Sequence, residues 1–142
     1  MNKIFQLVTN NSKVLTEYSN NDAISVDYLS TGSFLDVLID VRDKVQGGWH
    51  LLSHPQASNL KPNQCPYKTI LISQGRAAET FARDIELIEL AISAYHKFTD
   101  GMIPPTWSEK AKSDFKTVDL SVINSAVNSS LMRQMLYGSC KQ

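Results

Sequence analysis

The stretch Tyr67-Lys68-Thr69-Ile70-Leu71-Ile72-Ser73 decides how the fold is predicted, because its centre is an unbroken apolar run. A strand with one face in water alternates apolar and polar residues, whereas a strand covered on both faces is apolar throughout. We therefore expect residues 67–73 to form an internal strand of a sheet that has helices on both faces.

Four segments around this strand have the features of helices. The clearest one begins at Ser33, where Asp36 three residues later makes a weak form of the capping box, and ends at Gly47-Gly48. Its apolar residues recur at helical spacing and form one stripe: Phe34, Val37, Leu38, Val41 and Val45. The other predicted helices cover residues 12–18, 79–98 and 121–138.

Strand patterns alternate with these helices along the chain. Short apolar or alternating segments predict four more strands, at residues 3–9, 24–28, 49–54 and, as an edge strand, 115–120. Such alternation favours an α/β fold with a mostly parallel sheet of about five strands flanked by helices. The length of 142 residues predicts a single domain over residues 1–142. The order of the strands stays open, and the two strands on either side of the long loop could form an antiparallel hairpin or a displaced pairing.

Composition and charge exclude some classes of protein. The chain has 14 Lys and Arg against 14 Asp and Glu, so its formal net charge is zero. Proteins that bind nucleic acid or membrane surfaces generally carry excess positive charge, so we expect neither partner. The apolar run at residues 4–8 is too short for a signal peptide, and no stretch is long enough for a transmembrane helix. We therefore expect a cytoplasmic protein, in which Cys65 and Cys140 are free thiols.

The acidic residues leave a gap in the middle of the sequence. Residues 44–78 contain no Asp or Glu, but they hold four basic residues and two histidines: Lys44, Lys61, Lys68, Arg76, His50 and His54. Three prolines stiffen the loop at residues 55–66, and lysines on a preformed loop are a reasonable receptor for a carboxylate or phosphate. The alternative is a basic loop that is exposed to solvent and binds no ligand.

The two histidines of this stretch could orient a ligand. His50 and His54 have the same parity, so on a strand they would point to one face. Their separation along a strand would be roughly 13 Å, which is too long for one metal ion, and further ligands are missing nearby. We therefore predict no metal and no cofactor. The favoured arrangement has one histidine packed in the structure and His54 exposed to a cleft.

Two further groups are candidates for ligand binding. Thr9-Asn10-Asn11 directly follows the first predicted strand, and ligands of open α/β sheets bind beyond the carboxyl ends of strands. An ordinary turn with helix capping explains the same residues. Arg42 lies at the border of the apolar stripe of its helix, where it could reach a ligand or pair with a nearby acid.

Taken together, several short motifs resemble the GrdX family. They are Gly48-Trp49-His50-Leu51-Leu52-Ser53-His54-Pro55, Lys61-Pro62 and Pro66-Tyr67-Lys68-Thr69-Ile70, with Thr9-Asn10-Asn11 and Val41-Arg42-Asp43. The resemblance implies a small protein encoded beside the glycine, sarcosine and betaine reductase systems of amino-acid-fermenting anaerobes. It assigns no catalytic residue, and His50, His54, Lys61, Tyr67 and Lys68 carry over only as the family signature. Residues 56–59 hold no glycine, which argues against a backbone nest for an anion there.

Three functions are compatible with these residues. The favoured one is an accessory protein that binds a small carboxylate or phosphate, or a reductase subunit, through its basic loop. The alternative is a small enzyme with His54 as general acid or base and Lys61 or Lys68 stabilising an anion. A third is an assembly factor, for instance a homodimer with Trp49 and Trp107 at its interface, although both could equally be core residues.

Overall fold

The computed structural model describes residues 4–56, 64–74, 82–103 and 105–136. These residues form one four-stranded sheet in the order β2-β1-β4-β3, with β1 at Phe5–Thr9, β2 at Ile24–Tyr28, β3 at Trp49–Leu51 and β4 at Thr69–Gln74. The helices are α1 (Ser12–Tyr18), α2 (Phe34–Gln46), α3 (Ala82–Thr99), α4 (Glu109–Val127) and α5 (Ser130–Leu136). None of these helices is both long and apolar enough to cross a bilayer.

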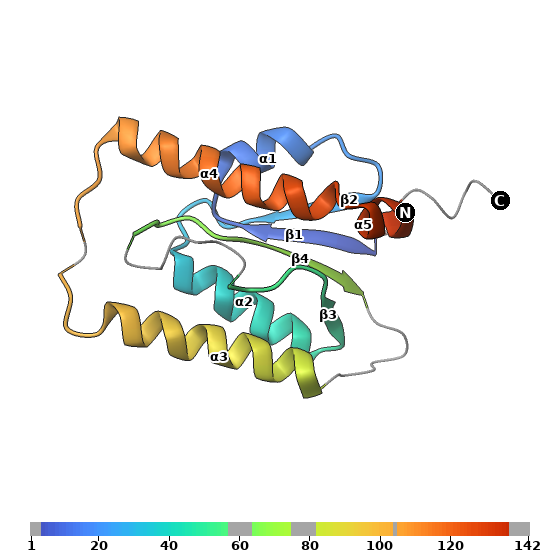
Figure 1. Cartoon of the computed structure of the whole chain (residues 1–142), viewed down its shortest axis with the longest axis horizontal. Coiled ribbons are helices and arrows are strands. Elements are labelled where there is room, and N and C mark those ends of the chain that lie inside the picture. The colour runs from blue at the N-terminus through green and yellow to red at the C-terminus, as the bar shows by residue number, and fades with distance from the viewer. Residues whose placement is uncertain (1–3, 57–63, 75–81, 104, 137–142) are drawn as a thin grey trace.

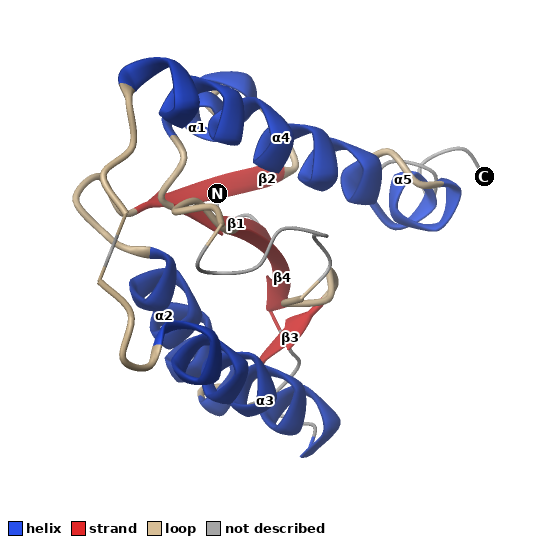
Figure 2. Ribbon diagram, turned by 60° about the vertical axis from the view of Figure 1, so that its left-hand side comes forward, coloured by secondary structure: helices blue, strands red, loops and turns tan. Residues whose placement is uncertain are grey.

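Helices cover both faces of the sheet, as the apolar run of β4 predicts. Figure 1 shows α1, α4 and α5 on one side of the sheet and α2 with α3 on the other, and Figure 2 shows the sheet between these two layers. Alternate residues of β4 serve the two cores: Ile70 and Ile72 pack against α2 and α3, whereas Leu71 packs against α1 and α4. The α/β class is therefore confirmed.

The prediction of a mostly parallel sheet is wrong. β1 and β2 pair in parallel, but β4 runs antiparallel to both β1 and β3. Parallel neighbours need a long crossover, usually a helix, and the residues that the structure describes between β3 and β4 contain none, which fits the antiparallel pairing of these two strands. As a result of the antiparallel pairing, Thr69 at the start of β4 lies beside Thr9 at the end of β1.

The prediction of about five strands is also wrong. Residues 115–120, expected as an edge strand, lie inside α4, whose N-cap Ser108 accepts a hydrogen bond from Ala111 N. The inward positions of this helix are Asp119, Ile123 and Val127, and the acid at the first of them interrupts the apolar stripe. The strand expected at 49–54 ends at Leu51, short of His54.

The helices near the candidate site have the ends that their sequences predict. At the start of α2, Ser33 Oγ accepts from Asp36 N, and the Asp36 carboxylate accepts from Ser33 N, which completes the capping box. Gly47 ends this helix, and Gly48 follows with a φ of 108°. Asn11 caps α1 by accepting a hydrogen bond from Lys13 N. These caps fix the loops that carry Asn10 and Phe34.

Candidate functional site

A cavity of about 470 Å³ lies at the end of the sheet where β1 finishes and β4 begins. Its walls come from five segments: Asn10 after β1, residues 30–34 at the start of α2, Pro66 and Tyr67 before β4, the last turns of α3, and the chain from α3 into the first turn of α4, which contributes Met102, Ile103, Pro105, Trp107 and Lys112. Pockets of small-molecule ligands commonly measure about 300–1,000 Å³. The cavity is therefore large enough for a metabolite.

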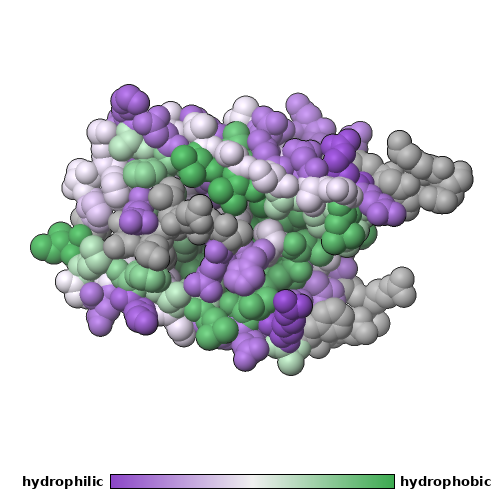
Figure 3. Space-filling view, in the orientation of Figure 1, coloured by the Kyte–Doolittle hydropathy of each residue, from purple (hydrophilic) through white to green (hydrophobic). Residues whose placement is uncertain are grey.

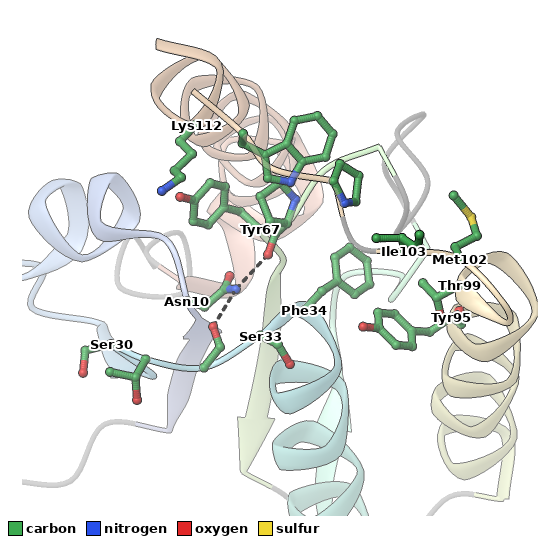
Figure 4. Close-up of a pocket in the computed structure, with 15 residues that line it drawn as sticks. Asn10, Ser30, Ser33, Phe34, Tyr67, Tyr95, Thr99, Met102, Ile103 and Lys112 are labelled. Carbon is green, nitrogen blue, oxygen red and sulfur yellow. Dashed lines mark hydrogen bonds between the residues drawn. The ribbon is translucent and has the colours of Figure 1, made fainter. Parts of the chain in front are cut away.

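Asn10 joins three of these segments. Its side-chain nitrogen donates to the backbone carbonyls of Pro66 at 2.9 Å and Gly32 at 3.2 Å, as the dashed lines of Figure 4 show. Its side-chain oxygen accepts from Lys68 N at 2.9 Å. One amide thus fixes the loop before α2 and the chain before β4 against the end of β1.

Aromatic rings form much of the cavity wall. Phe34, Tyr67, Tyr95 and Trp107 all line it. Phe34 and Tyr95 stack with their ring centroids 5.7 Å apart, and Trp107 meets Phe115 edge to face at 4.8 Å. These contacts hold the rings in place before any ligand arrives.

Lys68 brings a buried ammonium group against this wall. The residue is only 5 % exposed, and its Nζ lies 5.8 Å from the centroid of the Phe34 ring. Within the described residues, no hydrogen bond or ion pair reaches this ammonium, since the bond to Asn10 comes from the Lys68 backbone. Burial lowers the pKa of Lys68 to about 8, against the opposing attraction of Asp119.

A second lysine lies on the opposite wall. Lys112 of α4 lines the cavity and pairs with the exposed Glu109 at 3.1 Å. Figure 4 shows its side chain beside the Tyr67 ring, across the cavity from Tyr95. Burial raises the pKa of Tyr67, while the positive charge of Lys112 lowers it. The cavity therefore has lysines near two of its walls.

A model of the family described as GrdX-like protein matches residues 6–128. The chain belongs to the GrdX family. No curated protein and no solved structure matches it. The matched range includes the sheet apart from Phe5 and four of the helices, and every segment of the cavity lies within it.

Two of the predicted site residues of this GrdX-family chain, Asn10 and Tyr67, line the cavity. Lys68 is not among the lining residues, but its ammonium lies against the ring of Phe34, which lines the cavity. Asn10, Tyr67 and Lys68 come together because β4 is antiparallel to β1, so that the residues before β4 lie at the carboxyl end of β1.

Thr9 and Asn11, the neighbours of Asn10, have other partners. Both are fully buried beneath α4. Asn11 Nδ2 donates to Asp119 Oδ2 at 2.9 Å, and the Thr69 hydroxyl donates to the same oxygen at 2.6 Å. The Thr9 and Thr69 hydroxyls share a hydrogen bond of 2.7 Å. This network anchors α4 to the sheet, and burial raises the pKa of the Asp119 carboxyl at its centre.

The structure places three other predicted residues, His50, His54 and Arg42, outside the set that lines the cavity. His50 lies at the far end of β4, with its Nδ1 3.3 Å from the Asp84 carboxylate of α3. His54 is exposed and its Nδ1 accepts a hydrogen bond from Gln56 N at 3.0 Å. Arg42 pairs with its neighbour Asp43 at 3.1 Å. Lys61 lies outside the described residues.

Several cavity residues escaped sequence reasoning. Phe34 and Tyr95 sit at the ends of apolar stripes, where the pattern does not distinguish a core residue from a cavity wall. Lys112 gives no sequence signal at all. Trp107 follows two prolines in the loop between α3 and α4, and that composition was the one available indication of a ligand-binding loop. Trp49, the other tryptophan, packs against the core at α2 and α3.

Proposed function

We propose that this chain is an accessory protein of a glycine reductase system that binds a small anionic metabolite in the cavity. Membership of the GrdX family suggests the association with glycine reductase systems. The observation that carries the binding proposal is the Lys68 ammonium, buried beside the cavity without a hydrogen-bonding partner among the described residues.

A buried ammonium group without a partner destabilises a fold. The cost of desolvating a charge is compensated only when an opposite charge or hydrogen-bond acceptors replace the lost water. Asp119 attracts Lys68, but its carboxylate bonds to Thr69 and Asn11 on the other face of the sheet. An anion in the cavity would supply what Lys68 lacks, and Lys112 would add a second positive charge.

The start of α2 is not the source of positive potential in this proposal. Ser33 and Phe34 of this region line the cavity, and free N–H groups at a helix start commonly attract anions. The Asp36 carboxylate already accepts from Ser33 N, which places a negative charge at this helix end. The anion is therefore attracted by side chains, above all by Lys68.

The alternative function, a small enzyme that uses His54 as general acid or base, has less support. Neither His54 nor Lys68 lines the cavity, but Lys68 lies against the wall residue Phe34, whereas the exposed His54 accepts a hydrogen bond from Gln56 N. A general base must reach the proton that it transfers, either directly or through one water. The favoured chemistry is therefore binding, with Lys68 as the charged partner.

The test is calorimetric titration with acetate, acetyl phosphate and inorganic phosphate at millimolar concentration. We expect binding to the wild-type protein and a loss of at least tenfold in affinity for Lys68→Met, which keeps the length of the side chain and removes its charge. The matched control is Lys97→Met, because Lys97 is exposed on α3. Equal affinities of wild type and Lys68→Met, or no binding to either, would overturn the proposal.

A further inference from the structure

The cavity is larger and more aromatic than a bare anion requires. Acetate and phosphate have only four or five non-hydrogen atoms, whereas pockets of about 470 Å³ fall within the range that holds much larger ligands. Four aromatic residues line the wall, and Phe34 with Tyr95 presents a stacked pair there. Anchoring an anion alone would leave these rings without a role in recognition.

The charges around the cavity decide which kind of group the rings receive. Aromatic walls suit either a cation or another ring, because ring faces attract positive charge and rings also stack on one another. The Lys68 ammonium already lies against the Phe34 ring, and the Lys116 ammonium lies 5.4 Å from the centroid of the Tyr67 ring. A cationic ligand would therefore be repelled by lysines, and an uncharged ring is the better occupant.

The rim of the cavity has the same apolar character. Met102 and Ile103, between α3 and α4, line the cavity and are 47 % and 89 % exposed. Figure 3 shows an apolar projection at the end of the molecule where α3 leads to α4, and Figure 4 shows both side chains beside Tyr95. A ring held against Tyr95 would bury part of this exposed apolar surface.

We infer that the ligand of the cavity is an aromatic anion, in which one ring is joined to a carboxylate or phosphate group. The ring packs against the aromatic wall formed by Phe34, Tyr95 and Trp107. The anionic group lies toward Lys112, which lines the cavity, and toward Lys68, which lies against the Phe34 ring. This inference rests on the proposed function, because it assumes that the cavity binds an anion. Beyond the proposed function, we expect the aromatic ring of the ligand to contribute a large part of the binding affinity.

The experiment follows the fluorescence of Trp107, which lines the cavity. The chain has two tryptophans, so Trp49→Phe leaves Trp107 as the single reporter. The probes are acetate, phenylacetate, phenyl phosphate, neutral phenylacetamide and cationic phenethylamine. We expect phenylacetate or phenyl phosphate to bind at least tenfold more tightly than acetate, and the stronger of the two identifies the anionic group.

Two controls locate the binding and its charge dependence. In the reciprocal variant Trp107→Phe, Trp49 at β3 reports from the other end of α3, and its emission should not change on titration. In Lys68→Met within the Trp49→Phe background, phenylacetate should lose at least tenfold in affinity while phenylacetamide is unaffected. Urea unfolding of each variant verifies that the fold is intact.

The outcomes separate this inference from the proposed function. Acetate that binds as tightly as phenylacetate would overturn the aromatic ligand and leave anion binding in place. Phenylacetamide or phenethylamine that binds as tightly as phenylacetate would overturn the anionic ligand, and with it the proposed function. No binding of any probe would overturn both.

Discussion

Replacing Lys68 with methionine should make the protein more stable and at the same time abolish its binding of anions. The pKa of Lys68 falls from its ordinary 10.5 to about 8 because burial strips water from the ammonium. Methionine fills nearly the same space without a charge, and in the described residues no hydrogen bond to Nζ is lost. A functional charge that destabilises the fold is a common compromise in binding sites.

The size of the expected gain in stability follows from the ordinary pKa of lysine and the lowered pKa of Lys68 in the folded protein. The interval from about 8 to 10.5 corresponds to about 3 kcal/mol, at 1.36 kcal/mol for each tenfold change in proton affinity. The pKa of about 8 already includes the attraction of Asp119, so this interval is the net cost of holding the charge in the folded protein. We therefore expect Lys68→Met to raise the free energy of unfolding at pH 7 by about 1–3 kcal/mol.

The pH dependence gives a second, independent signature. Below pH 8, Lys68 is charged in both the folded and the unfolded protein, so the destabilisation is complete. Between about pH 8 and 10.5 the folded protein loses this proton while the unfolded chain keeps it, so the wild type gains stability as the pH rises. The difference between variant and wild type should therefore shrink across this window.

Urea unfolding of both proteins, followed by circular dichroism at several pH values from 6 to 10, measures this difference. Other titrating groups cancel in the comparison, provided that they respond to pH alike in the two proteins. A variant that is less stable than the wild type at pH 7, or a difference that stays constant from pH 7 to 10, would refute the reasoning. Either result would mean that Lys68 has a partner that stabilises its charge.

Three other predictions concern the surroundings of the cavity. Asn10→Ala removes three hydrogen bonds and should lower the free energy of unfolding by about 2–4 kcal/mol, with weaker ligand binding, in calorimetry and urea unfolding. Asp119→Ala leaves two buried donors without their acceptor and should cost about 2–4 kcal/mol, whereas Asp114→Ala on the exposed side of α4 should change stability by less than about 0.5 kcal/mol. Cys65 is buried and its pKa is raised to about 11, so in a Cys140→Ser background it should react with a thiol reagent at pH 8 only after unfolding; rapid reaction of the native protein would contradict its burial.

The α/β class and the boundaries of α1 and α2 were predictable because they depend on local signals, whereas the single helix expected at residues 121–138 is the end of α4 followed by the separate helix α5. The run Ile70-Leu71-Ile72 needs cover on both faces, and Ser33 with Asp36 begins a helix wherever that segment is placed. The direction of a strand is not a local property, because it depends on the path of the loop that connects it to the preceding strand. The loop before β4 carries no pattern that fixes its path, so the antiparallel pairing of β1 and β4 was not predictable.

The edge strand predicted at residues 115–120 failed for a physical reason that also explains part of the site. An inward carboxylate at Asp119 is unusual in a helix stripe, because a buried charge normally destabilises the fold. Here Thr69 and Asn11 donate to it, and these residues lie on β4 and before α1. This hydrogen-bond network joins α4, β4 and the residue before α1, so the spacing of residues within α4 alone could not reveal it.

The antiparallel strand β4 is what makes the candidate site possible. In a parallel arrangement, the beginning of β4 would lie beside the beginning of β1, and Lys68 would be a sheet length away from Asn10. Reversal of the strand brings Tyr67 and Lys68 to the end of β1 and beside the first turn of α2. The cavity lies at the carboxyl ends of the parallel strands β1 and β2, where ligands of open α/β sheets commonly bind, and the antiparallel strand β4 brings Lys68 to the same end. Residues 9–11 and 67–68 therefore lie at the same end of the sheet although the predicted topology was wrong, and the cavity-lining residues that the sequence prediction left out include the aromatic side chains.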